Sequence, residues 1–435
     1  MAERLASNYA LTMWEKIYQI FKVKEIRNKI LYVAGLLVVF RLFASTPIPG
    51  IDVAQIKAYF EGSQVFGMIN LFSGGALSQM SIMMLGVGPY VTSSIILQLL
   101  TMIFPSLKEM YQEGGEAGHR KFNQYTRVLT VPLAILQAYG LMVVLQRQQL
   151  LGVLTPLNIV FNIMVATAGS IFLMWLGELI SEKGIGNGIS LLIFAGIVAS
   201  LPQDLKQLIT TYDPGQIPSY VAFLAITVVV VGGIVFITEA QRNIPVAYAK
   251  RIRGNRVYGG SSTYLPIRVN QAGMIPIIFA LSLLLFPNIL AGILSAAPLP
   301  WLANFAKSMQ LFFQNQLVYG IFYFVLVVAF TYFYTAIVFD PKAIAENMQK
   351  QGGFIPGIRP GISTMDYLSH IINRITFWGA VFLGVVAVIP LIVQYATNFK
   401  TLTIGGTAIL IVVAVLLDSM QQIDSQLTMR EYEGF

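Results

Sequence analysis

The chain has 435 residues, of which 56% are hydrophobic and 11% are charged, and its formal net charge is +8. Soluble domains carry about 25% charged residues, so this composition excludes a soluble domain and indicates an integral membrane protein. Cysteine is absent, which excludes disulfides and thiolate metal sites.

The N-terminal residues 1–29 are charged and amphipathic, and they predict a cytosolic interfacial segment rather than a cleavable signal peptide. Its candidate membrane-facing residues are Trp14, Ile17, Tyr18, Ile20 and Phe21. A first half of the chain is predicted at 30–205, a second half at 206–420 and a cytosolic tail at 421–435.

Stretches without Asp, Glu, Lys or Arg set the positions of the predicted membrane spans, since a spanning helix needs about 20 apolar residues. The interval 62–107 is charge-free but too long for one helix, and it is rich in glycine before Ser81. It predicts a short re-entrant piece at about 65–77, followed by a full span. The ten predicted spans are 30–48, 79–104, 122–146, 153–178, 187–203, 216–238, 270–296, 315–339, 375–396 and 403–418. The first span carries Arg41 near its far end, where the side chain can reach the interface.

The distribution of basic residues gives the orientation. With ten spans, one face collects 22 of the 28 Lys and Arg residues, and the other face collects 6. The positive-inside rule therefore puts both termini in the cytosol. It also makes two long basic loops cytosolic, at 241–268 and 340–374. Their charge suits anionic lipids, ribosomal RNA or an acidic protein surface.

Catalytic and coupling chemistry is not indicated. The acidic residues nearest the membrane lie at the ends of spans; they are Glu178, Glu239, Asp340 and Asp418. A proton- or sodium-coupled transporter usually has an ionisable residue within its spans. Gly184–Gly188 lacks the Lys-Ser/Thr of a nucleotide-binding loop and predicts a tight turn. The sequence therefore predicts neither an enzyme nor a bound cofactor, and any energy must come from a partner.

Ten spans divide into five plus five at about residue 205, which predicts an inverted repeat. The second span of each half carries a similar interruption, Gly86-Val87-Gly88-Pro89 in one and Gly273-Met274-Ile275-Pro276 in the other. Polar residues on the same spans indicate a seam or contact with water: Thr92, Ser93, Ser94, Gln98, Asn270, Gln271 and Ser282. The alternative is that Gly and Pro are simply frequent in membrane helices, and that Ser and Thr bond their own helix.

A series of motifs in a fixed order runs along nearly the whole chain: Thr46-Pro47-Ile48-Pro49-Gly50-Ile51-Asp52, Asn70-Leu71-Phe72-Ser73-Gly74-Gly75, Asn123-Gln124-Tyr125-Thr126-Arg127, Gly184-Ile185-Gly186-Asn187-Gly188, Arg256-Val257-Tyr258-Gly259-Gly260, Phe354–Gly361 and Tyr432-Glu433-Gly434-Phe435. This series resembles the SecY family, the channel subunits of the bacterial protein-conducting translocon. The resemblance implies an all-α polytopic membrane protein, with ten helices in two pseudo-symmetric halves. These halves would form a clamshell around a central pore.

The resemblance also assigns roles to residues. The re-entrant segment is a plug, here Phe66, Asn70, Leu71, Phe72, Ser73, Gly74 and Gly75. The pore ring falls on Val87, Val91, Ile189, Ile193, Ile278 and Ile411, with Ile95 as a possible addition. The lateral gate falls on Pro89, Thr92, Gln98, Asn270, Pro276 and Ser282. The docking surface for the partner is Arg242, Lys250, Arg251, Arg256 and Arg359.

The implied function is a channel in the bacterial plasma (inner) membrane that passes unfolded secretory chains across the membrane and releases transmembrane helices sideways into lipid. The implied partners are SecE-like and SecG-like membrane subunits, the SecA motor ATPase, the ribosome, signal sequences with their nascent chains, and anionic lipids. A secondary transporter of a small solute is the main alternative, because inverted repeats also occur there. A structural scaffold is a third reading, but it needs neither matched interruptions nor a plug.

Overall fold

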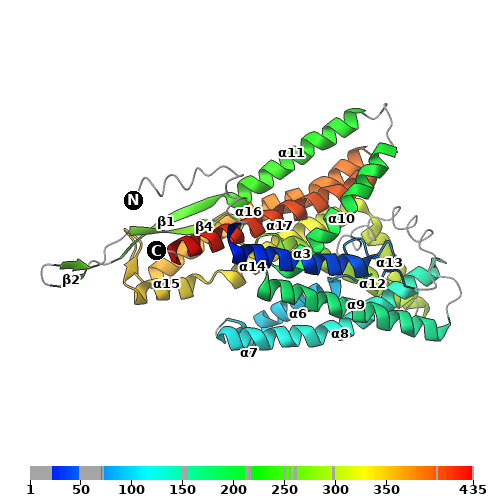
Figure 1. Cartoon of the computed structure of the whole chain (residues 1–435), viewed down its shortest axis with the longest axis horizontal. Helices are drawn as coiled ribbons and strands as arrows, with labels where there is room; N and C mark the ends of the chain where they lie inside the picture. The colour runs from blue at the N-terminus through cyan, green and yellow to red at the C-terminus, as the bar shows by residue number, and fades with distance from the viewer. Residues whose placement is uncertain are drawn as a thin grey trace. The chain divides into compact units, whose positions relative to one another are not determined.

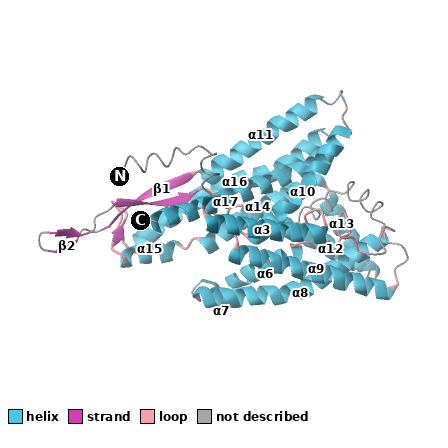
Figure 2. Cartoon of the chain, viewed as in Figure 1, coloured by secondary structure: helices cyan, strands magenta, loops and turns pink. Residues whose placement is uncertain are grey.

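The structure is a computed structural model that describes residues 22–48, 70, 73–112, 114–148, 150, 155–210, 215, 217–248, 251–253, 256–258, 262–295, 299–397 and 400–433. Helices make up most of these residues, and strands are confined to the segments between α11 and α12 and between α15 and α16 (Figure 2). The mostly helical, multi-span fold expected from the sequence is confirmed.

Contacts divide the chain into two compact units. The first is Met1–Tyr212, Leu285–Lys307 and Val415–Phe435, and the second is Asp213–Leu284 and Ser308–Ala414. The helices of the first unit are α3 (Lys24–Ala44), α6 (Gly88–Ile103), α7 (Pro105–Gln112), α8 (Gly115–Arg147), α9 (Pro156–Lys183) and α10 (Gly188–Thr210). Those of the second are α11 (Ile217–Glu239), α14 (Gln316–Val338), α15 (Pro341–Lys350) and α16 (Ile362–Thr397). Residues of both units occur in α12 (Ile275–Ser295), α13 (Pro300–Gln314) and α17 (Lys400–Glu433).

A helix overlaps each of the ten predicted spans. Within the described ranges, six helices are long and apolar enough to cross a membrane, or seven if α6 and α7 count as one span. These two helices are bent by 116° at their break. The multi-span character is therefore confirmed, whereas the count of ten spans stays a prediction.

The second predicted span begins later than expected. Residues 73–87 form a series of turns, and α6 starts only at Gly88. Two hydrogen bonds tie the turns to the end of the first span: the Ile48 amide donates to the Met80 carbonyl over 2.9 Å, and the Ile82 amide donates to the Thr46 carbonyl over 3.1 Å. These backbone groups are thereby lost to a helix, so the prediction of a helix from residue 79 is wrong.

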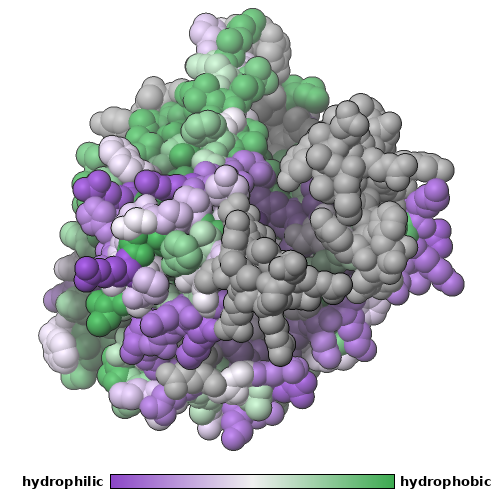
Figure 3. Space-filling model, turned by 90° about the vertical axis from the view of Figure 1, so that its left-hand side faces the viewer, coloured by the Kyte–Doolittle hydropathy of each residue, from purple (hydrophilic) through white to green (hydrophobic). Residues whose placement is uncertain are grey.

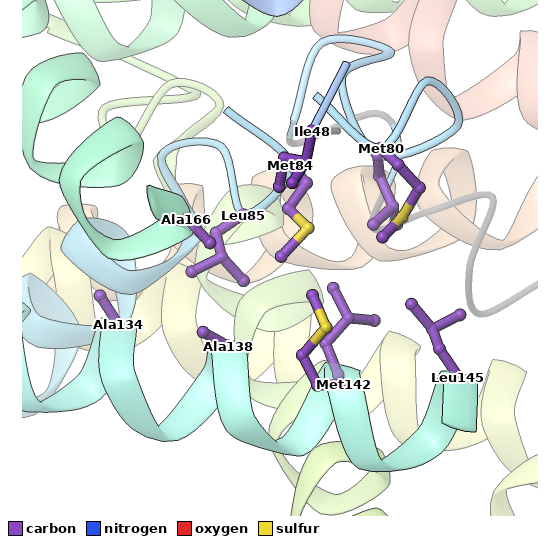
Figure 4. Packing of buried hydrophobic residues seen from close by; sticks show 11 residues of the cluster. Ile48, Met80, Met84, Leu85, Ala134, Ala138, Met142, Leu145 and Ala166 are labelled. Atoms are coloured by element: carbon purple, nitrogen blue, oxygen red, sulfur yellow. The ribbon is translucent and has the colours of Figure 1, made fainter. Parts of the chain in front are cut away.

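The turns pack on α8 and α9 through a buried apolar cluster (Figure 4). The cluster consists of Ile48, Leu77, Met80, Met84, Leu85, Ala134, Ala138, Leu141, Met142, Leu145 and Ala166. Small side chains on the helices allow their backbones to approach closely, and methionines fill the irregular space between them. The turns also approach α9 closely at Gly169, where an added Cβ would overlap the carbonyl of Ile82.

The turn between α7 and α8 is also tightly packed. The Tyr111 ring lies 5.1 Å from the His119 ring and 4.7 Å from the Phe122 ring, measured between centroids. Burial among these groups raises the pKa of the Tyr111 hydroxyl. This contact fixes the return of the chain into α8.

A β-hairpin forms most of the first basic loop of the second unit (Figure 1). Strands β1 (Gln241–Tyr248) and β4 (Ser262–Arg268) pair antiparallel, and β5 (Gly353–Phe354) adds to the other edge of β1. Strands β2 (Arg251–Arg253) and β3 (Arg256–Tyr258) form a separate pair. Strand β4 is thus an edge strand, and it contains Pro266 opposite Asn243.

The sheet rests on an apolar core of its own. Its buried members come from β1, β4, α15, α16 and the residue after β5, namely Ile244, Val246, Ile267, Met348, Ile355, Leu368, Ile371 and Ile372. Residues at alternate positions of a strand point to the same face, which is why Ile244 and Val246 are buried while their neighbours Asn243 and Pro245 are exposed. The basic loop is therefore a folded platform.

Among the six candidate spans of the described residues, α11 is the least covered, with 17% of its most apolar stretch buried. Its exposed apolar residues are Ile217, Val221, Leu224, Val228, Val229 and Phe236. Figure 3 shows hydrophobic and hydrophilic surface on one face of the molecule. Hydrophobic residues gather in the upper part of the view and hydrophilic residues in the middle and lower parts. An exposed apolar helix of this kind fits lipid or a partner helix.

Candidate channel elements

The predicted plug contains a tight turn held by polar side chains. Gly74 and Gly75 have φ angles of +65° and +82°, a region that glycine adopts without steric cost. The Asn70 carbonyl accepts from the Gly75 amide over 2.8 Å, and the Asn70 Oδ1 accepts from the Ser78 amide over 2.9 Å. The Ser73 Oγ accepts from the Leu77 amide over 3.0 Å. Phe66, Leu71 and Phe72 lie outside the described residues.

The two predicted interruptions have the same local geometry, although they are helix starts and not breaks within helices. Gly86 and Gly273 both have φ +60°. Three residues later, Pro89 and Pro276 are the second residues of α6 and α12. Proline is favoured in the first turn of a helix, because its missing amide proton has no partner there in any case. The sequence therefore located the matched features correctly but placed them inside longer helices.

The predicted pore-ring residues are distributed over both units. Val87 caps α6, Val91 lies in its first turn, and Ile193 lies on α10; their side chains are 2%, 3% and 1% exposed. In the second unit, Ile278 of α12 and Ile411 of α17 are 4% and 1% exposed. Ile189 is partly buried, and the additional candidate Ile95 is buried. Their convergence on one pore stays a prediction.

The predicted gate residues of α6 are linked to the neighbouring helix α8. Thr92 donates to the Gly88 carbonyl over 2.9 Å and accepts from the Gln137 amide nitrogen at 3.5 Å. Ser93 donates to the Thr126 carbonyl over 2.7 Å. Gly86, just before α6, accepts from Ser170 of α9 over 3.0 Å. No sequence pattern indicated these partners, because they lie 33 to 84 residues away along the chain.

Buried polar atoms without a partner concentrate on the predicted gate segments. Among the described residues, four of the five such atoms belong to these segments: Gln98 Oε1, Asn270 Oδ1, Gln271 Oε1 and Ser282 Oγ. Asn270 satisfies only its nitrogen, which donates to the Gly273 carbonyl over 3.1 Å. An unsatisfied buried polar group costs about 1–3 kcal/mol, so each of these atoms needs an explanation such as water or a passing ligand.

Of the predicted docking residues, Arg242 lies on the folded platform, and Arg251 and Arg256 lie on the separate pair of strands β2 and β3. Arg242 is exposed on β1. The backbone of Arg251 pairs with Tyr258, and Arg253 pairs with Arg256. These strands carry three arginines within six residues, while Lys250 lies in a part of the chain that the structure does not describe.

Arg359 is exposed on a turn between β5 and α16. Gly357 and Gly361 on either side of it have φ angles of +85° and +95°. The Arg359 carbonyl accepts from the Thr364 hydroxyl over 2.9 Å, and the Ile358 amide donates to the Ile355 carbonyl over 3.0 Å. The arginine is thus presented by a fixed turn.

An ion pair joins α8 and α9: Arg127 Nε lies 2.7 Å from Glu178 Oε1. Glu178 was expected at the end of a span, and no sequence pattern indicated that it pairs with Arg127. Arg41 was expected to extend to the interface, but its guanidinium instead donates to the Gly74 carbonyl over 3.2 Å.

Solved structures of channels share this architecture. The structure described as "The structure of a protein conducting channel" matches with a TM-score of 0.63 and 21% identity over 90% of each chain. "Sec61 in the Canine ribosome-channel complex from the endoplasmic reticulum" matches with a TM-score of 0.60, 20% identity and 90% of each chain covered. The fold is that of a protein-conducting membrane channel.

Similarity to other sequences identifies the family of channel to which the chain belongs. The chain is 44% identical to the protein translocase subunit SecY of Corynebacterium glutamicum, over 96% of this chain and 99% of the relative. It is 43% identical to the same subunit of Thermotoga maritima, over 97% and 98%. A family model described as SecY matches residues 81–420. The chain belongs to the SecY family.

Proposed function

We propose that this chain is the channel subunit of a protein translocase, passing unfolded secretory polypeptides across the bacterial plasma membrane. The similarity to translocase subunits over nearly the whole chain supports this proposal. No comparison favours the alternative, a transporter of small solutes.

One structural observation carries the assignment of the gate. The unpartnered buried atoms of Gln98, Asn270 and Ser282 belong to segments with matching Gly–Pro starts. When a gate opens to admit a chain, its lining residues contact water and the passing polypeptide. Polar lining groups can then form hydrogen bonds that they lack while the gate is closed. Pro89, Thr92 and Pro276 complete the proposed gate.

The remaining elements have complementary roles in this proposal. Branched apolar side chains at Val87, Val91, Ile189, Ile193, Ile278 and Ile411 close the pore, because they offer a passing chain no hydrogen bonds and discourage ions by dewetting. The segment with Asn70, Ser73, Gly74 and Gly75 acts as the plug. A related SecY structure is described as showing that its plug domain stabilises the closed state and maintains a membrane seal.

The basic platform receives the partner that supplies force. Arg242, Arg251, Arg256 and Arg359 would contact a SecA motor or a ribosome, and both termini would lie in the cytosol. Sec61, whose solved structure has a similar fold, occurs in a ribosome–channel complex. The exposed apolar face of α11 suits a transmembrane helix of a SecE-like subunit, and a SecG-like subunit and anionic lipids complete the assembly.

Reconstitution tests the proposal directly. Proteoliposomes holding this chain with SecE-like and SecG-like subunits should import a signal-bearing preprotein when SecA and ATP are added, and a preprotein without its signal sequence is the control. Deleting 66–75 should raise ion conductance in planar bilayers without SecA. Failure to import, combined with uptake of a small solute along an ion gradient, would favour the transporter instead.

A further inference from the structure

The turn at Gly74 sits at a three-way junction within the first unit. Its carbonyl accepts a hydrogen bond from the Arg41 guanidinium of α3 at 3.2 Å. A Cβ added to Gly74 would lie 2.8 Å from Cζ of Phe40 and 2.9 Å from Cα of Gly196 on α10. There is therefore no room for any side chain at Gly74, and two helices enclose it.

Gly196 meets the same restriction from the opposite side. A Cβ added there would overlap the backbone of Gly74. Two glycines that each exclude a side chain at the other define a direct backbone-to-backbone contact, which is the closest packing that a helix permits. Ile193, one of the proposed pore residues, lies one turn away on α10.

Arg41 is the only charged residue between Lys29 and Asp52, and it lies in the last turn of α3. A charged side chain within a membrane segment is costly unless it is paired. Arg41 is partly buried, and its guanidinium is directed at the turn. Hydrogen bonds from charged donors are about twice as strong as neutral ones.

We propose that Arg41, Gly74 and Gly196 form a latch that holds the re-entrant segment closed, with Arg41 as its positioning residue. The latch regulates the plug of the proposed function and rests on that assignment. The Arg41 guanidinium holds the turn through the Gly74 carbonyl. The glycine pair lets the turn pack directly against α10. Release of the segment then requires the Arg41 hydrogen bond to break and the glycine contact to separate.

Hydrogen–deuterium exchange of residues 70–80 in the reconstituted complex measures the latch without reference to transport. The amides of Gly75, Leu77 and Ser78 have partners in this segment. Loss of the charged hydrogen bond in Arg41→Met should speed their exchange about tenfold, which corresponds to about 1.4 kcal/mol. Arg41→Lys keeps the charge without the planar donor group and should give a smaller increase. Arg120→Met, which removes an exposed arginine of α8, is the matched control and should change nothing.

The glycine contact has its own pair of variants. Gly196→Ala should speed exchange of 70–80, whereas Gly35→Ala should not, because nothing lies within 4 Å of a Cβ at Gly35. Wild-type exchange in both Arg41→Met and Gly196→Ala would overturn the latch. So would acceleration in Gly196→Ala alone, because Arg41 would then hold nothing.

Conductance in planar bilayers separates the latch from the proposed function. Both variants should leak ions at rest if the segment is a plug. Faster exchange with wild-type conductance would keep the latch and overturn the plug assignment. A leak without faster exchange of 70–80 would overturn the latch.

Discussion

Replacing Ser282 by alanine should stabilise the resting protein, whereas the same replacement at Ser93 should destabilise it. Both serines are buried, with 4% and 0% exposure. They differ in pairing: the Ser282 hydroxyl has no partner, and the Ser93 hydroxyl donates to the Thr126 carbonyl over 2.7 Å. The two variants therefore remove the same hydroxyl group, once where it has no hydrogen-bond partner and once where it has one.

The magnitudes follow from this difference. An unsatisfied buried polar group costs about 1–3 kcal/mol, so Ser282→Ala should gain stability within that range. An intramolecular hydrogen bond contributes about 0.5–1.5 kcal/mol net, so Ser93→Ala should lose about that amount. The two variants should thus differ from each other by roughly 1.5–4.5 kcal/mol, with the unmodified chain between them.

Thermal unfolding of the purified complex in micelles, followed by tryptophan fluorescence, measures both shifts. The midpoint should rise for Ser282→Ala and fall for Ser93→Ala. If Ser282 lines the gate, the same stabilisation makes opening harder, and preprotein import should slow about 5- to 30-fold for a gain of 1–2 kcal/mol. A fall in midpoint for Ser282→Ala would refute the reasoning, because it would mean that the hydroxyl is satisfied in the folded protein.

Three further predictions test other elements. Arg359→Glu should cut SecA-dependent import at least tenfold while leaving membrane insertion of the channel intact, and normal import would remove the docking role. Cysteines placed at Thr92 and Ser282 should crosslink under oxidation and block import; the chain has no native cysteine to interfere, and failure to crosslink in any state would separate these positions. Gly169→Ala should destabilise the fold by about 1–3 kcal/mol, because the new methyl group would overlap the Ile82 carbonyl; an unchanged unfolding midpoint would contradict that close approach.

The sequence predicted the helices well where charge alone decides. A long charge-free segment in a bilayer can satisfy its backbone hydrogen bonds by forming a helix. Most helix positions therefore followed from the intervals that lack Asp, Glu, Lys and Arg. The turns at 73–87 were predicted in part only, since they are as apolar as a helix. Their backbone pairs with residues 46–48, and a partner so distant along the chain leaves no local pattern.

The candidate site shows the same limit. Gly86, Pro89, Gly273 and Pro276 were recognisable because glycine and proline act locally on the backbone. The partners of Arg41 and Arg127 could not be recognised from the sequence, because side-chain pairing depends on how the helices pack. The platform also went unpredicted, although β1 carried a usable signal: buried Ile244 and Val246 alternate with exposed neighbours at the period of a strand.

Strand β4 has a consequence for a protein that handles unfolded chains. An open sheet edge offers unpaired backbone groups to any extended polypeptide nearby, and an unfolded client is such a polypeptide. Pro266 lies in this edge strand, and proline supplies no backbone donor. The platform thereby offers unfolded clients a poorer template for strand addition, so a client is less prone to be captured at this edge.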